Sequence, residues 1–279
     1  MKKFITSVIA LAAAALSLSL AACDAQPVTK SGVLVTNAVS GVSDTEYVIC
    51  ISKNVEESAE LLETVNAVIE EVDVNKVAAN YCDYANRRAN KLLESYMYNL
   101  NDNTGGPLYV MSATFEPFNY SGAGGAYTDG IDAYLMLHVA EKLDRRLIIY
   151  DKDYSYAYAQ TKEGKAHIFS AGVAQSEALK TDFLVSDVYL TGKQQIVCDK
   201  NENFTSLSDL KGLTIGVLSG REGEKIVKDA IENGALKGTG ATLAAYSTDT
   251  EAEAMLHTQM CDVLVIDEFP AKLIVAKAN

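Results

Sequence analysis

The chain has 279 residues, of which 48% are hydrophobic and 22% are charged, and its formal net charge is −13. This length is enough for one large domain or two modest lobes with a buried core. The negative balance argues against nucleic acid and anionic lipid surfaces as partners. The five cysteines show no CxxC spacing and the three histidines are scattered, so the sequence predicts neither a metal site nor a cofactor.

The first segment, residues 1–22, has the features of a secretory signal. Two lysines precede an apolar stretch rich in Ala and Leu, which ends in small residues directly before Cys23. A short apolar stretch with a small-residue cleavage site is typical of export rather than of a membrane-spanning helix. The segment resembles a bacterial lipoprotein signal, which implies lipidation of Cys23 and anchoring to the extracytoplasmic face of the membrane. An ordinary signal peptide with a chance cysteine is the alternative. Residues 23–30 are then a polar tether.

Two strands and two helices are predicted before residue 99. The apolar runs at 33–37 and 47–52 are typical of strands. Residues 56–72 place their Leu, Val and Ile side chains on one face at helical spacing, and 74–98 continue as a second helix. Residues 99–107 are rich in Asn and Gly, which indicates a linker.

After the linker, predicted strands alternate with predicted helices. The strands are 108–113, 147–150, 167–173, 194–200, 214–220, 241–246 and 261–267. The helices are 131–143, 154–163, 223–233, 250–259 and 270–277, with one further helical turn at 207–210. Such alternation favours an α/β fold with parallel sheets flanked by helices.

Six segments match a known family jointly in residue type and spacing. They are 45–72, 113–120, 129–135, 170–189, 206–220 and 261–272. Together they resemble extracytoplasmic solute-binding proteins of family 3, the polar-amino-acid group that serves ABC importers. The resemblance implies a two-lobe, periplasmic-binding-protein-like (type II) fold with two hinge strands. It also implies a monomer that captures a small polar solute, such as an amino acid, and delivers it to importer membrane subunits.

The order of the segments departs from that family. The part that resembles residues 45–72 closes the family's chain, whereas here it comes first, which is what a circular permutation looks like. Lobe 1 would then hold 53–98 and 107–193, lobe 2 would hold 31–46 and 200–279, the hinge strands would be 47–52 and 194–199, and 99–106 would be the linker. The alternative is that residues 31–100 form an unrelated helical domain.

A permuted chain makes three spatial predictions. Asn279 should lie near the start of the strand that follows Ser31. The two hinge strands should run side by side in opposite directions. Cys50 and Cys198 would then be near neighbours, although a disulfide would require their Cα atoms to lie within about 7 Å.

The resemblance also implies the ligand-binding residues of an interlobe cleft. Phe115 and Tyr154 match the positions that stack on the ligand, and Asp267 matches the position that holds its ammonium group. Gly172 and Ser176 fall in the segment that lines the pocket. Packing within a lobe is the alternative role for the two aromatic residues. Capping of the following helix is the alternative for Asp267.

The family's carboxylate anchor is missing, because its arginine position falls on Leu179. Arg221 stands at a predicted helix start where the family has a threonine. There the backbone N–H groups and a guanidinium would converge on an anion, so we expect Arg221 to replace the missing anchor. A surface ion pair with Glu222 or Glu224 is the alternative role.

The sequence also allows two alternative functions. Some relatives of this family have become dehydratase-type enzymes, which need a positioned acid or base. The matching segments offer Asp267 and Glu116 but no histidine, so we assign no catalytic residue. A ligand-sensing or degenerate binding module would fit the loss of the arginine anchor as well as a new ligand does.

Overall fold

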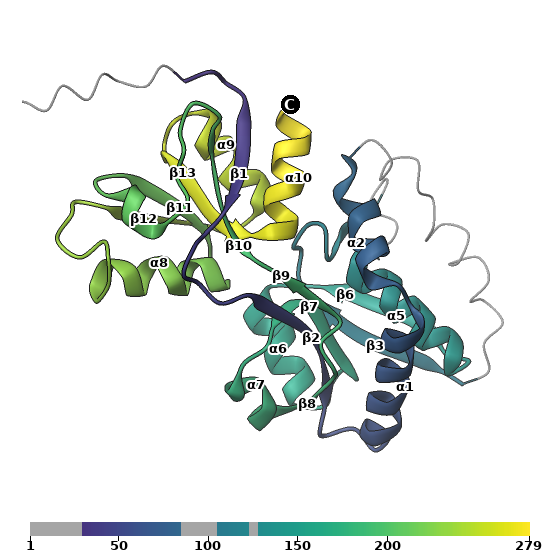
Figure 1. Ribbon diagram of the computed structural model, residues 1–279. Coiled ribbons are helices and arrows are strands. Elements are labelled where there is room, and N and C mark those ends of the chain that lie inside the picture. Colours follow the sequence, from purple (N-terminus) through teal and green to yellow (C-terminus); the bar gives the residue numbers. More distant parts are fainter. Residues whose placement is uncertain (1–29, 85–104, 123–127) are drawn as a thin grey trace, which may run out of the picture.

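Two lobes make up the part of the chain that the computed structural model describes, namely residues 30–84, 105–122 and 128–279 (Figure 1). The predicted signal segment and Cys23 lie outside the described residues, as do residues 85–98 of the second predicted helix and most of the predicted linker. Within the described ranges, no helix is both long enough and apolar enough to cross a membrane.

The first lobe is built on a six-stranded sheet in the order β6-β3-β7-β2-β8, with β9 also pairing with β2. Its strands are β2 (Thr45–Ser52), β3 (Pro107–Ser112), β6 (Arg146–Asp151), β7 (Ile168–Ala174), β8 (Phe183–Val185) and β9 (Leu190–Gly192). Its helices are α1 (Ser58–Glu71), α2 (Val74–Cys82), α5 (Ile131–Lys142), α6 (Tyr154–Lys162) and α7 (Glu177–Asp182). The short strands β4 (Tyr120–Ser121) and β5 (Thr128–Asp129) pair antiparallel in a separate two-stranded sheet.

The second lobe is built on a five-stranded sheet in the order β1-β10-β13-β11-β12. Its strands are β1 (Leu34–Ala38), β10 (Gln194–Asp199), β11 (Thr214–Leu218), β12 (Thr242–Tyr246) and β13 (Val263–Asp267). Its helices are α8 (Glu222–Glu232), α9 (Asp249–His257) and α10 (Glu268–Ala278), with a 3-10 turn at Leu207–Leu210. The predicted two-lobe α/β fold is therefore confirmed.

The sheets are mixed rather than wholly parallel. In the first lobe β3 runs parallel to β6 and β7, while β2 is antiparallel to β7, β8 and β9. In the second lobe β11 runs parallel to β12 and β13, while β10 is antiparallel to β1 and β13. The antiparallel strands β2 and β10 are the ones that follow a passage of the chain from one lobe into the other.

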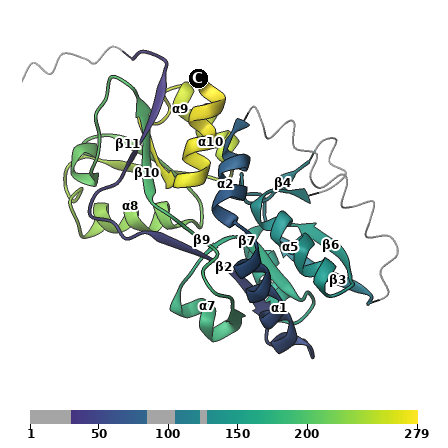
Figure 2. The same ribbon diagram turned by 45° about the vertical axis from the view of Figure 1, so that its right-hand side comes forward.

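Helices α1 and α2 belong to the first lobe. The apolar stripe of α1, formed by Leu61, Val65 and Val68, is buried, as its helical spacing predicts. Both helices pack against α5, and α2 also packs against α10 of the second lobe, beside which it lies in Figure 2. The alternative of a separate helical domain does not hold for these residues.

The chain passes between the lobes at residues 39–44 and again at Lys193, close to the predicted hinges but not within them. The expectation that residues 47–52 and 194–199 run side by side is wrong. Each is a strand inside its own lobe, and β10 is buried along its whole length. The two passages nevertheless run antiparallel, with Thr45 paired to Gly192.

The expected proximity of Cys50 and Cys198 is also wrong. Cys50 pairs with Phe169 and Val185 in the first sheet, whereas Cys198 pairs with Val35 in the second. Both thiols are free and buried. Each is a small apolar side chain in the core of a different lobe.

Asn279 lies against β1 in the second lobe. Its Oδ1 accepts a hydrogen bond of 3.1 Å from the Leu34 backbone N–H, and its Nδ2 donates one of 2.8 Å to the Leu34 carbonyl. The predicted nearness of Asn279 to the strand that follows Ser31 is therefore correct.

Candidate functional site: the interlobe cleft

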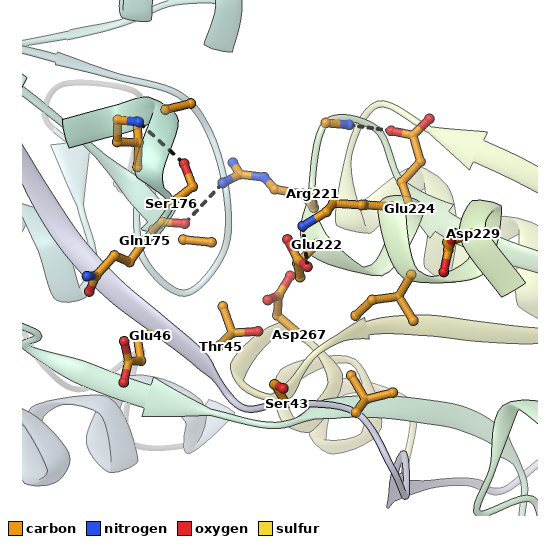
Figure 3. A pocket seen from close by; sticks show the side chains of 18 of the residues that line it. Ser43, Thr45, Glu46, Gln175, Ser176, Arg221, Glu222, Glu224, Asp229 and Asp267 are labelled. Atoms are coloured by element: carbon orange, nitrogen blue, oxygen red, sulfur yellow. Dashed lines mark hydrogen bonds and ion pairs between the residues drawn. The ribbon is translucent and has the colours of Figure 1, made fainter. Parts of the chain in front are cut away.

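A cleft with a volume of about 1090 Å³ lies between the two lobes. Residues of both lobes line it, including the β1–β2 passage, the β7–α7 loop and the first turns of α8. Figure 3 shows Arg221 extending across this space from the second lobe, with Asp267 and Thr45 near it. Of the predicted binding residues, Tyr154, Gly172, Ser176, Arg221 and Asp267 line the cleft.

Arg221 connects the two lobes at the inner wall of the cleft. It is the N-cap residue of α8, but its side chain leaves the helix and crosses to the first lobe. The guanidinium carbon lies 3.6 Å from the ring centroid of Phe115 and 5.1 Å from that of Tyr154. Nη1 donates hydrogen bonds to the carbonyl oxygens of Ala171, at 2.8 Å, and of Gly172, at 3.3 Å. The alternative role as a surface ion pair is therefore wrong.

The aromatic wall consists of Phe115 and Tyr154, with Phe118 behind Phe115. The rings of Phe115 and Phe118 stack with centroids 5.2 Å apart. Phe115 is 3% exposed and lies beneath the Arg221 guanidinium. Tyr154 begins α6, where the Asp153 side chain caps the helix, and its ring meets Phe169 edge-on.

Gly172 allows this close packing. Its φ is +58°, and a Cβ atom there would lie 2.7 Å from ring carbons of both Phe115 and Phe118. Its backbone N–H donates a hydrogen bond of 2.8 Å to the carboxylate of Asp132. That carboxylate also accepts hydrogen bonds from Ser170 and Tyr189. Asp132 is fully buried, and burial raises its pKa. This carboxylate fixes the strand that presents the carbonyls to Arg221.

Asp267 lies at the N-cap position of α10, but its side chain makes no capping hydrogen bond. Instead Oδ1 accepts hydrogen bonds of 2.8 Å from the Tyr47 hydroxyl and of 2.8 Å from Gln194 Nε2. The same Gln194 amide donates to Thr45 Oγ1 at 3.0 Å. Asp267 is 2% exposed. Burial raises the pKa of its carboxyl, while the Tyr47 hydrogen bond and the Arg221 charge oppose that rise.

Ser176 and Leu179 have local structural roles. The Ser176 hydroxyl caps α7 by accepting a hydrogen bond of 3.4 Å from the Leu179 backbone N–H. The Leu179 side chain is buried in the apolar cluster that contains Phe169 and Phe183. It offers nothing to an anion, so the cation nearest the aromatic wall is Arg221 of the opposite lobe.

The charge of the cleft is predominantly negative. Its acidic lining residues are Asp44, Glu46, Glu177, Glu222, Glu224, Asp229, Glu232 and Asp267, against the basic Arg221, Lys225 and Lys228. A concave surface of one sign attracts ligands of the opposite sign. In the described part of the chain, no group of three or more His, Cys, Asp or Glu side chains is placed to hold a metal ion.

Sequence reasoning missed three residues that surround Asp267, namely Thr45, Tyr47 and Gln194. Each lies at the start of β2 or β10, beside a passage between the lobes. Polar side chains in otherwise apolar strands need partners when buried, and all three are at most 5% exposed. That pattern was present in the sequence, but the partner could not be identified without the pairing of the strands.

Comparison with known proteins agrees with this geometry. Residues 108–264 match the family described as bacterial extracellular solute-binding proteins, family 3. This span is more than half of the chain, so the chain belongs to that family.

Individual relatives bind amino acids. The chain is 31% identical over 109 residues to the arginine-binding extracellular protein ArtP of Bacillus subtilis (strain 168), a match that spans 39% of this chain and 42% of ArtP. It is also similar to an ancestral arginine-binding protein solved with arginine, at 29% identity and a TM-score of 0.52, covering 59% of this chain and 71% of that one. The chain is also similar to an ancestral arginine-binding protein solved with glutamine, at 27% identity and a TM-score of 0.54. That match covers 62% of this chain and 74% of the other.

Proposed function

We propose that this protein is a lipid-anchored, extracytoplasmic solute-binding protein. It captures an amino acid or a related small polar solute between its lobes and delivers it to an ABC importer. The observation that carries this proposal is the position of Asp267, a carboxylate that lines the interlobe cleft and is held by Tyr47 and Gln194.

The buried carboxylate favours a ligand with an ammonium group. Burial disfavours an ionised carboxyl and is the main cause of the raised pKa of Asp267, and the charge of Arg221 only partly opposes it. A ligand cation beside Asp267 would add a second opposite charge and form charge-assisted hydrogen bonds. The acidic lining would draw such a ligand in. Amino-acid binding by the relatives points to the same class of solute.

Thermal unfolding of the protein against a panel of amino acids and related solutes tests this proposal. A ligand that binds only the folded state stabilises it by about 2.7 kcal/mol at a concentration of 100 times Kd. We expect at least one amino acid to raise the melting temperature, and chromatography of the incubated solute to show no turnover. Absence of any shift would favour a degenerate module, and appearance of a product would favour an enzyme.

The lipid anchor is tested separately from binding. Lipidation of Cys23 predicts that wild-type protein fractionates with membranes, while Cys23→Ser is released or left unprocessed. A Cys50→Ser variant controls for general effects, because Cys50 is buried in the first lobe. Unchanged membrane association of Cys23→Ser would contradict the anchor.

We also propose that the order of parts is a circular permutation of the family's order. The match to the family spans residues 108–264, while β1, β2, α1 and α2 lie outside it and complete both lobes. The two hydrogen bonds between Asn279 and Leu34 support this proposal, because they place the last residue beside the strand that would follow it in the family's order.

A further inference from the structure

We infer that the Arg221 side chain fills the space beside the aromatic wall of Phe115 and Tyr154, here called the aromatic pocket. It thereby excludes a guanidinium-bearing ligand side chain from that pocket. The inference rests on the proposed function, since it specifies which solutes that cleft accepts.

The contacts of Arg221 are those that a bound guanidinium compound would make. A planar cation stacks on an aromatic face, and the 3.6 Å distance to the Phe115 centroid is such a stack. Its N–H groups donate to carbonyl oxygens, here those of Ala171 and Gly172. The covered Phe115 ring is 3% exposed, so no surface is left on it for a second cation.

The remaining donors of Arg221 define what the ligand can present to it. Both hydrogen bonds that the guanidinium makes to described residues use Nη1. Nε and Nη2 therefore make none in that part of the chain, and Arg221 is a lining residue of the cleft. A guanidinium edge binds a carboxylate through two parallel hydrogen bonds. The accepted solute thus directs a carboxylate towards Arg221, its ammonium towards Asp267, and carries no guanidinium into the pocket.

Removal of the Arg221 side chain should open the pocket to an external guanidinium compound. Methylguanidinium at low millimolar concentration is the probe, and the melting temperature is the readout. We expect Arg221→Ala to respond at concentrations about tenfold lower than the wild type does, in keeping with one stacked, hydrogen-bonded cation. Lys225→Ala is the matched control, because Lys225 also lines the cleft from α8 but pairs with Glu222 instead.

Arg221→Gln serves as a second variant if the alanine variant folds poorly, because it keeps part of the aliphatic chain. The stack itself can be measured in the intact wild-type protein by NMR. The Nε–H signal of Arg221, identified by its loss in Arg221→Gln, should be shifted upfield by the ring of Phe115. It should return towards the free-arginine position in Phe115→Leu but not in Tyr156→Leu, since Tyr156 is an exposed residue elsewhere on α6.

Equal responses of wild type and Arg221→Ala to methylguanidinium would overturn the inference, as would an Arg221 signal that Phe115→Leu leaves unmoved. Neither measurement uses the natural solute. A negative result with methylguanidinium or by NMR therefore does not change the outcome of the amino-acid panel. Conversely, if no amino acid in the panel raises the melting temperature, the methylguanidinium and NMR results can still be interpreted.

Discussion

The hydroxyl of Tyr47 in the first lobe donates a hydrogen bond of 2.8 Å to Oδ1 of Asp267 in the second lobe. Both side chains are at most 2% exposed. The phenol thus stabilises a buried carboxylate across the junction of the lobes, at the inner end of the cleft. Stability and ligand binding are linked through this contact, because the same carboxylate that Tyr47 supports is the one proposed to hold the ligand's cation.

Tyr47→Phe should destabilise the protein by about 1.5–3 kcal/mol, the usual contribution of a hydrogen bond to a charged group. The ring remains and can still pack on Phe118, whose centroid lies 4.6 Å away, so loss of packing contributes little. Urea unfolding at pH 7 measures the change. Tyr156→Phe is the control, because the Tyr156 side chain is exposed. Equal midpoints for the two variants would show that the Tyr47 hydrogen bond carries no net stability.

Gly172→Ala should destabilise the first lobe and open the aromatic wall. The new Cβ would lie 2.7 Å from ring carbons of Phe115 and Phe118, and φ is +58°. Strain and overpacking together should cost about 2–4 kcal/mol. Gly212→Ala is the matched control, since its φ is +76° but the nearest atom to its Cβ is 3.9 Å away. If thermal unfolding shows the same loss in both variants, crowding against the rings is not the cause.

The stability of the protein should depend on pH through Asp249. Burial, with the nearby charge of Glu116, raises the pKa of Asp249 to about 6, against the opposing charge of Lys277. Lys277 Nζ lies 3.0 Å from Glu116 Oε2 and 3.9 Å from Asp249 Oδ2. Between pH 4 and pH 6 the folded state therefore keeps a proton on Asp249 that the unfolded state has lost. The contribution of this group to the unfolding free energy falls as the pH rises through that window.

Asp249→Asn removes this titration. Relative to the wild type, the variant should gain up to about 3 kcal/mol of unfolding free energy between pH 4 and pH 7. Urea unfolding at four pH values measures the difference, with the exposed Asp229→Asn as control. Parallel curves for Asp249→Asn and the wild type would contradict the shifted pKa.

Hydrophobic periodicity predicted which segments are strands and which are helices, and the resemblance to the family supplied the two-lobe arrangement. The sequence predicted β2 and β10 correctly as strands, yet misplaced the passages between the lobes by a few residues. An apolar run identifies a strand but not the strands that pair with it. For this reason Cys50 and Cys198 were predicted to be near neighbours, although they lie in different sheets. Pairing between distant strands is decided by packing that no local pattern contains.

For the candidate site, the sequence identified Asp267 and Arg221 but not what they contact. The crossing of Arg221 to Phe115 depends on how the two lobes sit together, which residue spacing does not encode. Tyr47 was assigned to a predicted strand, but the sequence did not show that its hydroxyl donates a hydrogen bond to Asp267.

If the proposed permutation is correct, a chain with its parts rearranged into the family's order should fold into the same two lobes. This chain begins at Pro107, runs to Asn279 and continues through a short linker into residues 34–83. Because Asn279 contacts Leu34, a short linker can join them. The unfolding free energy of the reordered chain should therefore lie within about 1–2 kcal/mol of that of the original chain. Circular dichroism and urea unfolding measure the outcome. The control lacks residues 45–83, which leaves β7 and β8 without β2, and it should not fold. A reordered chain that fails to fold under conditions in which the original chain folds would contradict the proposed permutation.

Calorimetric titration of the solute selected by the thermal panel, into wild type and Asp267→Ala, tests the central claim most directly. If Asp267 holds the ligand's cation in the cleft, Asp267→Ala should weaken binding by about 2–5 kcal/mol, the range for loss of one partner of a buried charge pair. Asp229→Ala, which removes an exposed carboxylate from the same cleft, should weaken binding by less than about 1 kcal/mol. Equal affinity of the wild type and Asp267→Ala would contradict the account, because the solute would then be held somewhere other than at the buried carboxylate.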